Sequence, residues 1–359
     1  MALSTTSTNN KEIVWTSDFI KEYIRTSQFA SFMGGAGANN SVIFTKSEMN
    51  KVAGEQINIP LVGRLTGAGV GTGTLQGNEE SITSHGFRIT PTWRRNAVAV
   101  GRDQAKLSRI KLLDLGRPLL MDWEKEEIRD DIVTALGSIN GVAYGTASAG
   151  QKNTWNADNV DRVLYGDAVG NYNATHATAL LAVTAAMTLS QGIISLAKRL
   201  AKIADTHIKP MKTKDGDSKE FYVLFVPSFA MRDLRASLET LNSEAFSTSG
   251  FDKNPIFQGG DLMIDGTIVR EVPEIATIAG VGAVGIDVAP CYLCGNGAVG
   301  IAWGQMPRPT TRSDTDYDFI KGVGIEELVG VEKITAALHG ANAKDNGVFT
   351  LFVSGVADA

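Results

Sequence analysis

Two extended stretches separated by a glycine-rich run set the strongest constraint on how this chain can fold. From Gln56 to Leu65 apolar residues alternate with polar ones, which is typical of a strand, and Pro60 favours an edge position. A second extended stretch is predicted from about Ile82 to Val100. The run from Gly67 to Thr74 between them is too rich in glycine to pack by itself. We therefore predict a long, open hairpin with a mobile tip.

Periodicity and turn signals elsewhere predict a mixture of helices and strands. A loop-like stretch is expected from Asn140 to about Thr178, anchored by Trp155 and Tyr165. The predicted helices are a short one near Phe19–Ile24, one from Pro118 to Leu136, one after a Thr188/Gln191 capping box that carries Ile193, Ala197, Leu200 and Ala204, and one from Ser228 to about Thr240. The predicted strands are Phe221 to Val226, a hairpin around Asp265-Gly266, and stretches near 284–288, 298–303, 323–328 and 347–353. This mixed order indicates an α+β fold.

Composition favours a protein that is covered by partners. Charged residues make up 20% of the 359 positions, and 38 are glycine, so much of the surface carries little charge. The net charge of -5 argues against a protein whose main task is to neutralise phosphates. The N-terminus lacks the pattern of a signal peptide and no run is long enough to span a membrane, so we expect neither export nor membrane insertion.

The Cys291-Tyr292-Leu293-Cys294 motif is the clearest candidate for chemistry. A CxxC can form half a zinc site or a redox dithiol. No second cysteine pair exists, and His85, His176, His207 and His339 lack the spacing that would complete a tetrahedral site. Gly295-Asn296-Gly297 follows the motif where a redox dithiol would open a helix. We interpret both cysteines as small, buried core residues.

The remaining candidates also favour structural interpretations. Neither glycine cluster, at Gly34–Gly37 or Gly67–Gly73, ends in the Gly-Lys-Ser/Thr of a phosphate loop. Asp314–Asp318 opens like a calcium loop but has Phe319 where glycine is needed, so it is interpreted as an acidic turn, with an inter-subunit cation site left open. The acidic run from Asp122 to Asp131 is interpreted as the solvent face of a helix. We predict no catalytic residue, cofactor or metal.

Two basic groups are candidates for binding nucleic acid or another subunit. Arg94-Arg95 and Lys198-Arg199-Lys202 are small clusters, too few for a nucleic-acid footprint. We interpret them as partners in salt bridges between subunits.

The segment from Ala53 to Val62 resembles the major capsid proteins of podophage-type tailed bacteriophages. The resemblance continues in family order through Arg64-Leu65, Gly67, Gly69-Val70, Thr74-Leu75 and Gly77-Asn78-Glu79-Glu80. Phe19–Arg25 upstream, and Asp316-Tyr317-Asp318 ahead of Gly322–Ile325 downstream, look like further landmarks. Gln76 departs from the Glu expected there.

This resemblance implies the Hong Kong 97-type capsid fold. Its parts would be an N-terminal arm (1–50), an extended β-hairpin loop (51–105), an axial domain (185–310), and a peripheral domain (106–184 and 311–359) whose spine helix lies near 118–136. The hairpin and helix predicted from the residues match two of these parts.

The implied function is structural: self-assembly into the icosahedral head shell that encloses a tailed phage's DNA. Implied partners are other copies in hexamers and pentamers, then portal, scaffold and decoration proteins, with assembly in the host bacterial cytoplasm and no membrane. An encapsulin-like compartment and a soluble enzyme that uses the Cys291/Cys294 pair stay open as alternatives. The candidate assembly-interface residues are Phe19, Tyr23, Arg64, Gly69, Gly71, Asn78, Glu79, Glu80, Arg94 and Arg95.

One prediction concerns covalent cross-linking. Some members of the wider fold join a lysine on the extended loop to an asparagine of a neighbouring subunit. This chain has no lysine between Lys51 and Lys106. We therefore expect boiled, reduced particles to give a single monomer band on a denaturing gel; a ladder of higher bands would contradict this.

Overall fold

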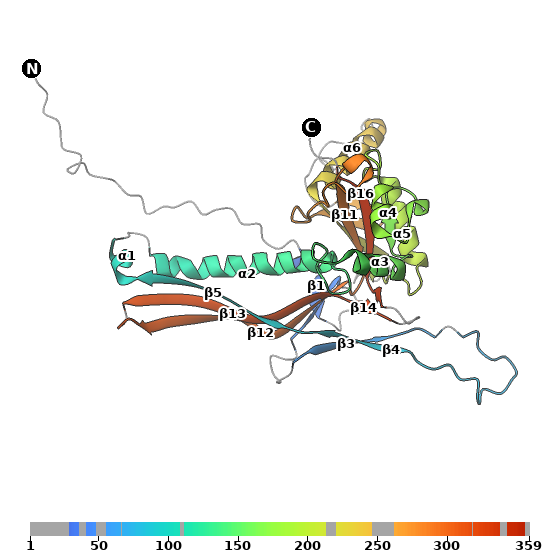
Figure 1. Ribbon diagram of the computed structural model, residues 1–359. Coiled ribbons are helices and arrows are strands. Elements are labelled where there is room, and N and C mark those ends of the chain that lie inside the picture. The colour runs from blue at the N-terminus through green and yellow to red at the C-terminus, as the bar shows by residue number, and fades with distance from the viewer. Residues whose placement is uncertain are drawn as a thin grey trace, which may run out of the picture. The chain divides into compact units, whose positions relative to one another are not determined.

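The computed structural model describes residues 29–35, 41–47, 55–65, 67–107, 111–212, 220–245, 262–317, 319–337 and 343–355 (Figure 1). The helix predicted near Phe19 lies outside these residues. The chain divides into two compact units. The described part of the first consists of Arg95–Glu126 and Pro307–Glu326, and the second contains the rest of the described chain.

A five-stranded sheet has the order β1-β2-β12-β13-β5. Its strands are β1 (Met33–Gly35), β2 (Ile43–Lys46), β12 (Val299–Thr315), β13 (Ile320–Lys333) and β5 (Thr92–Gly101). Strand β2 is parallel to both β1 and β12.

The first unit has its own small core. This unit contains α1 (Arg102–Leu107) and the first part of α2 (Leu112–Leu136), of which α2 contributes to the core. Leu120 of α2 packs with Val323 and Ile325, and Trp123 lies at the edge of this cluster. Gly116 permits the close approach, because a Cβ there would lie 2.9 Å from the Cγ2 atom of Val323.

The predicted start of α2 was wrong. The helix begins at Leu112, and Pro118 lies inside it, not in its first turn. Proline removes one backbone hydrogen bond from a helix interior. Packing of Leu113 and Leu120 on the small core offsets that cost, so tertiary contacts override the local signal.

A seven-stranded mixed sheet dominates the second unit. Its main path is β6-β16-β11-β8-β10-β9, with β7 paired to β8. The strands are β6 (Val163–Tyr165), β16 (Val348–Ser354), β11 (Val288–Cys294), β8 (Glu220–Val226), β10 (Thr267–Glu271), β9 (Leu262–Ile264) and β7 (Met211–Lys212). Every position of β11 and β16 is buried, so both faces of these strands are covered. They form the centre of the largest core.

Besides the C-terminal part of α2, further helices of the described chain belong to this unit (Figure 1). They are α3 (Ala149–Asp158), α4 (His176–Leu181), α5 (Gln191–Ile203) and α6 (Ser228–Ala245). Short 3-10 turns occur at η2 (Ala30–Phe32), η4 (Val169–Asn171) and η6 (Ala283–Gly285), and β14 (Thr335–Ala336) pairs with β15 (Lys344–Asp345). The predicted α5, β8 and α6 are confirmed in place.

Several local predictions need correction, and the capping box is the first. Helix α5 has Ser190 as its N-cap, without the box predicted from Thr188 and Gln191. A complete capping box exists instead at α3, between Ser148 and Gln151. The region from Asn140 to Thr178 is therefore not simply a loop. Its expected anchors, Trp155 and Tyr165, are indeed buried.

Of two further local predictions, a hairpin turn is confirmed and a strand is wrong. The hairpin at Asp265-Gly266 is confirmed, with φ of 47° and 67° at the two turn residues, as a type I′ turn requires. The strand predicted near 284–288 is wrong: Val284 lies in η6 with φ of 57°, fully exposed, and β11 begins only at Val288.

The hairpin predicted from Gln56 onward is confirmed for its first part. Strand β3 (Ile57–Val62) pairs antiparallel with β4 (Ser84–Ile89), from Ile57 opposite Ile89 to Val62 opposite Ser84. Ile57, Ile59 and Ile89 are buried in a small cluster that also includes Ala302 of β12 and Ile334. The rest of the expected second strand is β5, which belongs to the five-stranded sheet and not to the hairpin.

Buried Arg162 fastens two loops to the sheet. Its guanidinium donates hydrogen bonds to the backbone carbonyls of Asp345, Asn346, Asp205 and Thr206, and it is 1% exposed. The one guanidinium group thereby satisfies all four of these backbone carbonyl groups.

A cage of aromatic rings surrounds His176, which is 2% exposed. The Tyr165 hydroxyl donates to Asn156 Oδ1 (2.9 Å), so its oxygen accepts from Nδ1–H of His176 (2.7 Å). Nε2 of His176 then accepts from the Tyr144 hydroxyl (2.9 Å). Burial, with the nearby Lys152 charge, lowers the pKa of His176 to about 4.

This network predicts acid sensitivity. The folded-state pKa lies below the ordinary 6.5, so the stabilisation from neutral His176 is complete above pH 6.5 and is lost as the pH falls toward 4. We expect it to amount to about 3 kcal/mol. Urea unfolding of the unassembled chain at pH 7 and pH 4 measures the loss, and His176→Gln should reduce it. Equal pH dependence in both proteins would contradict this role.

Candidate assembly surfaces

The loop from Gly63 to Thr83 closes largely on itself. The Gly63 amide donates to the Thr83 carbonyl at 2.8 Å, which extends the β3–β4 pairing. Glu80 accepts from the Gly67 amide and Glu79 from the Gly77 amide, each at 2.7 Å.

The Asn78 side chain also forms a hydrogen bond within this loop. It donates to the Thr74 carbonyl at 2.9 Å. The candidate residues Asn78, Glu79 and Glu80 thus each hold the loop's own conformation, and their contact with a neighbouring subunit stays a prediction.

The two candidate glycines differ. Gly69 has a φ of 72°, in the left-handed region that side chains rarely adopt, whereas Gly71 has no such constraint. No atom lies within 4 Å of a Cβ built at either position. Backbone conformation, not crowding, therefore requires glycine at 69.

Exposed apolar side chains gather at the open end of the hairpin and in its loop, whereas other outward positions of the paired strands, among them Asn58, Ser84 and Arg88, are polar. The large hydrophobic side chains at the open end and in the loop are more than half exposed: Val62 (65%), Leu65 (62%), Leu75 (66%) and Ile82 (71%). A surface of this kind is typical of an interaction site.

Arg64 lies on this same hairpin. Its Nη1 atom is 3.3 Å from Nε2 of His207, whose Nδ1 lies 2.7 Å from the Ala204 carbonyl and donates to it. An imidazole ring brings no negative charge, so this bond leaves the Arg64 charge uncompensated. No carboxylate pairs with Arg64 within the described part of the chain.

Arg94 is engaged inside its own subunit. Its Nε lies 2.5 Å from Glu327 Oε1, and its Nη1 lies 2.7 Å from Asp131 Oδ2 and 3.7 Å from Glu127 Oε2. Burial lowers the pKa of the guanidinium, but Glu327 and Asp131 outweigh it and raise the pKa overall. Burial raises the pKa of Glu327 against the opposing effect of Arg94. Arg95 is different: it is mostly exposed, and its Nε lies 3.9 Å from Glu326.

This acidic cluster, defined as Glu127, Asp131 and Glu327, was missed from the sequence. The acidic run on α2 was interpreted as a solvent face, yet two of its members bind a half-buried arginine. The only available signal was the Arg94-Arg95 pair on a predicted strand, which had been assigned to contacts between subunits.

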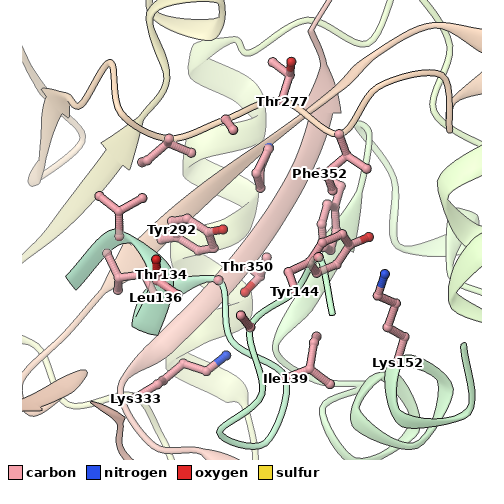
Figure 2. Close-up of a pocket in the computed structure, with 18 of the residues that line it drawn as sticks. Thr134, Leu136, Ile139, Tyr144, Lys152, Thr277, Tyr292, Lys333, Thr350 and Phe352 are labelled. Atoms are coloured by element: carbon pink, nitrogen blue, oxygen red, sulfur yellow. The ribbon is translucent and has the colours of Figure 1, made fainter. Parts of the chain in front are cut away.

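A cavity of about 600 Å³ lies beside the C-terminal end of α2. Figure 2 shows Leu136, Ile139, Tyr292 and Phe352 around it, with the Lys152 and Lys333 side chains below. Lys333 is neutralised by Asp345, 2.8 Å away, whereas Lys152 lies 4.0 Å above the Tyr144 ring. Thr134, which is exposed, also lines the cavity, so the cavity reaches the surface along α2.

The cysteines lie on opposite faces of β11. Cys291 packs in one core cluster and Cys294 in another, and burial raises the pKa of both thiols. They are free, which is the core role predicted for them.

The basic and acidic groups give no metal centre within the described ranges. Lys198 pairs with Asp265 of its own chain at 3.1 Å. No group of three His, Cys, Asp or Glu side chains in the described chain could hold a metal ion. The side chains of Asp314 and Asp318 lie outside that description, as do Phe19 and Tyr23. Among the described helices, none is long and apolar enough to cross a membrane.

Comparisons with known proteins agree on one family. Residues 4–357 match the family described as phage capsid protein. The major capsid protein of Pseudomonas phage KPP25 is 26% identical over 370 residues, covering 97% of this chain and 96% of that protein.

Solved structures show the same relationship. The capsid of cyanophage Pam1 is 32% identical and covers all of both chains with a TM-score of 0.89. The capsid of Ralstonia phage GP4 shares the fold at 22% identity, with a TM-score of 0.74 over 99% of this chain and 100% of that one. The expected α+β capsid fold is thereby confirmed, and these relatives are phage capsids, not encapsulins. The chain therefore belongs to the phage capsid protein family, as a major capsid protein that forms the shell of a tailed phage.

Proposed function

We propose that each subunit laps its β3–β4 hairpin over a neighbouring copy while the shell forms, and that the finished shell encloses double-stranded DNA. The observation that carries this proposal is the group of large apolar side chains at the open end of the hairpin and in its loop, Val62, Leu65, Leu75 and Ile82, which remain exposed in their own subunit. Many modest contacts of this kind would stabilise a shell through multivalency while still allowing misplaced subunits to leave.

The charge of the chain supports a passive wall around DNA. A net charge of -5 provides little attraction for phosphate, so packaged DNA would slide past the wall. We place assembly in the host bacterial cytoplasm, with portal, scaffold and decoration proteins as partners. In this proposal the subunit performs no reaction of its own, consistent with a Cys291/Cys294 pair that is split between two faces of a strand.

Electron microscopy of the purified full-length chain, expressed alone and with the phage's other head proteins, tests the proposal. We expect closed shells of uniform size that sediment far ahead of free subunits. Persistent monomers or dimers under both conditions, or bound nucleotide or zinc, would contradict it.

The hairpin loop offers a sharper test at its glycines. Gly69→Val places a β-branched residue at a φ of 72°, which is strained, whereas Gly71→Val enters open space without that strain. We expect the first change to lower the assembled fraction, measured by sedimentation, much more than the second.

Gly71→Val should leave the stability of the unassembled subunit within about 0.5 kcal/mol, because the loop is exposed. Gly69→Val should lower it by about 1–2 kcal/mol through local backbone strain, and the subunit should stay folded. Equal assembly of the two variants would show that loop conformation at Gly69 does not matter.

A further inference from the structure

We propose that the hairpin of one subunit docks along the C-terminal half of α2 in the next copy, with Arg64 on the acidic cluster and its apolar neighbours at the mouth of the cavity. This inference rests on the proposed function and names the surface that receives the hairpin.

The acidic cluster carries more negative charge than its own subunit balances. Three carboxylates surround the single Arg94 guanidinium within the described chain. Glu327, although 0% exposed and in contact with Arg94, keeps one carboxylate oxygen without a hydrogen-bond partner. Glu127 and Asp131 remain 43% and 44% exposed, so they can accept a further cation from outside.

The acidic cluster and the cavity mouth share one face of α2. Glu127, Asp131 and Thr134 are spaced by four and then three residues, which places them along one side of the helix. At 1.5 Å per residue, Asp131 and Thr134 are separated by roughly 4.5 Å along the axis. The acidic cluster and the apolar cavity that Thr134 lines therefore lie next to each other on the same subunit.

The hairpin presents the complementary pattern. The pairing of Val62 with Ser84 and of Gly63 with Thr83 continues to place Arg64 opposite Ile82. Val62 and Arg64 point to the same side, because side chains alternate along a strand. Arg64 thus lies between two exposed apolar side chains, Val62 and Ile82. A second cation, Arg88, lies on the same face opposite Asn58, at the other end of the paired strands.

The spacing between Val62 and Arg64 on the hairpin matches the spacing between the cavity mouth and the acidic cluster on α2. Two strand residues cover roughly 7 Å, so Val62 or Ile82 can reach the cavity mouth while the Arg64 guanidinium contacts Glu127 and Asp131. Within the described residues of the free subunit, Arg64 contacts the His207 ring and no carboxylate. Exchange of that ring for two carboxylates in the assembled shell would compensate the charges on both sides.

A charge exchange tests the proposal in the full-length chain. Arg64→Glu should lower the assembled fraction on the order of ten-fold, because like charges would then meet at every repeat of the contact. Glu127→Arg should have a similar effect on assembly. It leaves two carboxylates and two guanidinium groups in the cluster, so thermal unfolding of the unassembled subunit should not suffer.

The double variant Arg64→Glu/Glu127→Arg should restore assembly to within about two-fold of the unmodified chain. Arg199→Glu, an equal change of charge at an exposed position of α5, is the matched control and should assemble normally. Normal assembly of Arg64→Glu, or no rescue in the double variant, would overturn the inference.

A cross-link gives a readout that does not depend on assembly yield. Val62→Cys combined with Thr134→Cys should give disulfide-linked multimers on a non-reducing gel of oxidised shells, and either change alone should not. Absence of multimers from intact double-cysteine shells would count against this docking. Failure of the unmodified chain to form shells would instead refute the proposed function.

Discussion

The fold depends on one constraint: the β3–β4 hairpin ends in exposed apolar side chains that the subunit does not bury. Its inward face is satisfied, because Ile57, Ile59 and Ile89 pack with Ala302 of β12 and with Ile334. The outward side chains Val62 and Ile82 remain in solvent. Covering such side chains contributes roughly 25 cal/mol per Å² of apolar surface, so the hairpin gains stability only when another copy covers it. Shell formation and completion of the hairpin's packing are then the same event.

The rest of the subunit provides a firm base for that hairpin. Strands β11 and β16 are buried on both faces, and Arg162 fastens the adjoining loops through four backbone carbonyls. The interior is closely packed, so a force on the subunit causes little local deformation there. Flexibility is confined to places where few contacts oppose it, such as the open surroundings of Gly69 and Gly71.

Local sequence signals predicted elements well where a single short-range interaction decides the structure. The Asp265-Gly266 turn is such a case, because only residues that tolerate positive φ suit it. Signals failed where distant contacts decide. Pro118 would normally begin a helix, but Leu113 and Leu120 pack on strand residues more than 190 positions away, and the helix extends through the proline. The capping box at Ser148 was overlooked because the surrounding glycine and asparagine suggested a loop.

The acidic cluster could not have been found from sequence, because its members come from a helix and a strand that meet only after folding. A balanced ion pair at Arg94 would have served stability better, since each extra buried or half-buried carboxylate adds a desolvation cost. An excess of negative charge on α2 is more useful for specificity: it repels acidic surfaces and favours a cation at the open end of the hairpin, Arg64. Its cost to the free subunit is offset only when a correctly placed neighbour arrives. The same carboxylates that hold Arg94 inside the subunit can thus select the contact outside it.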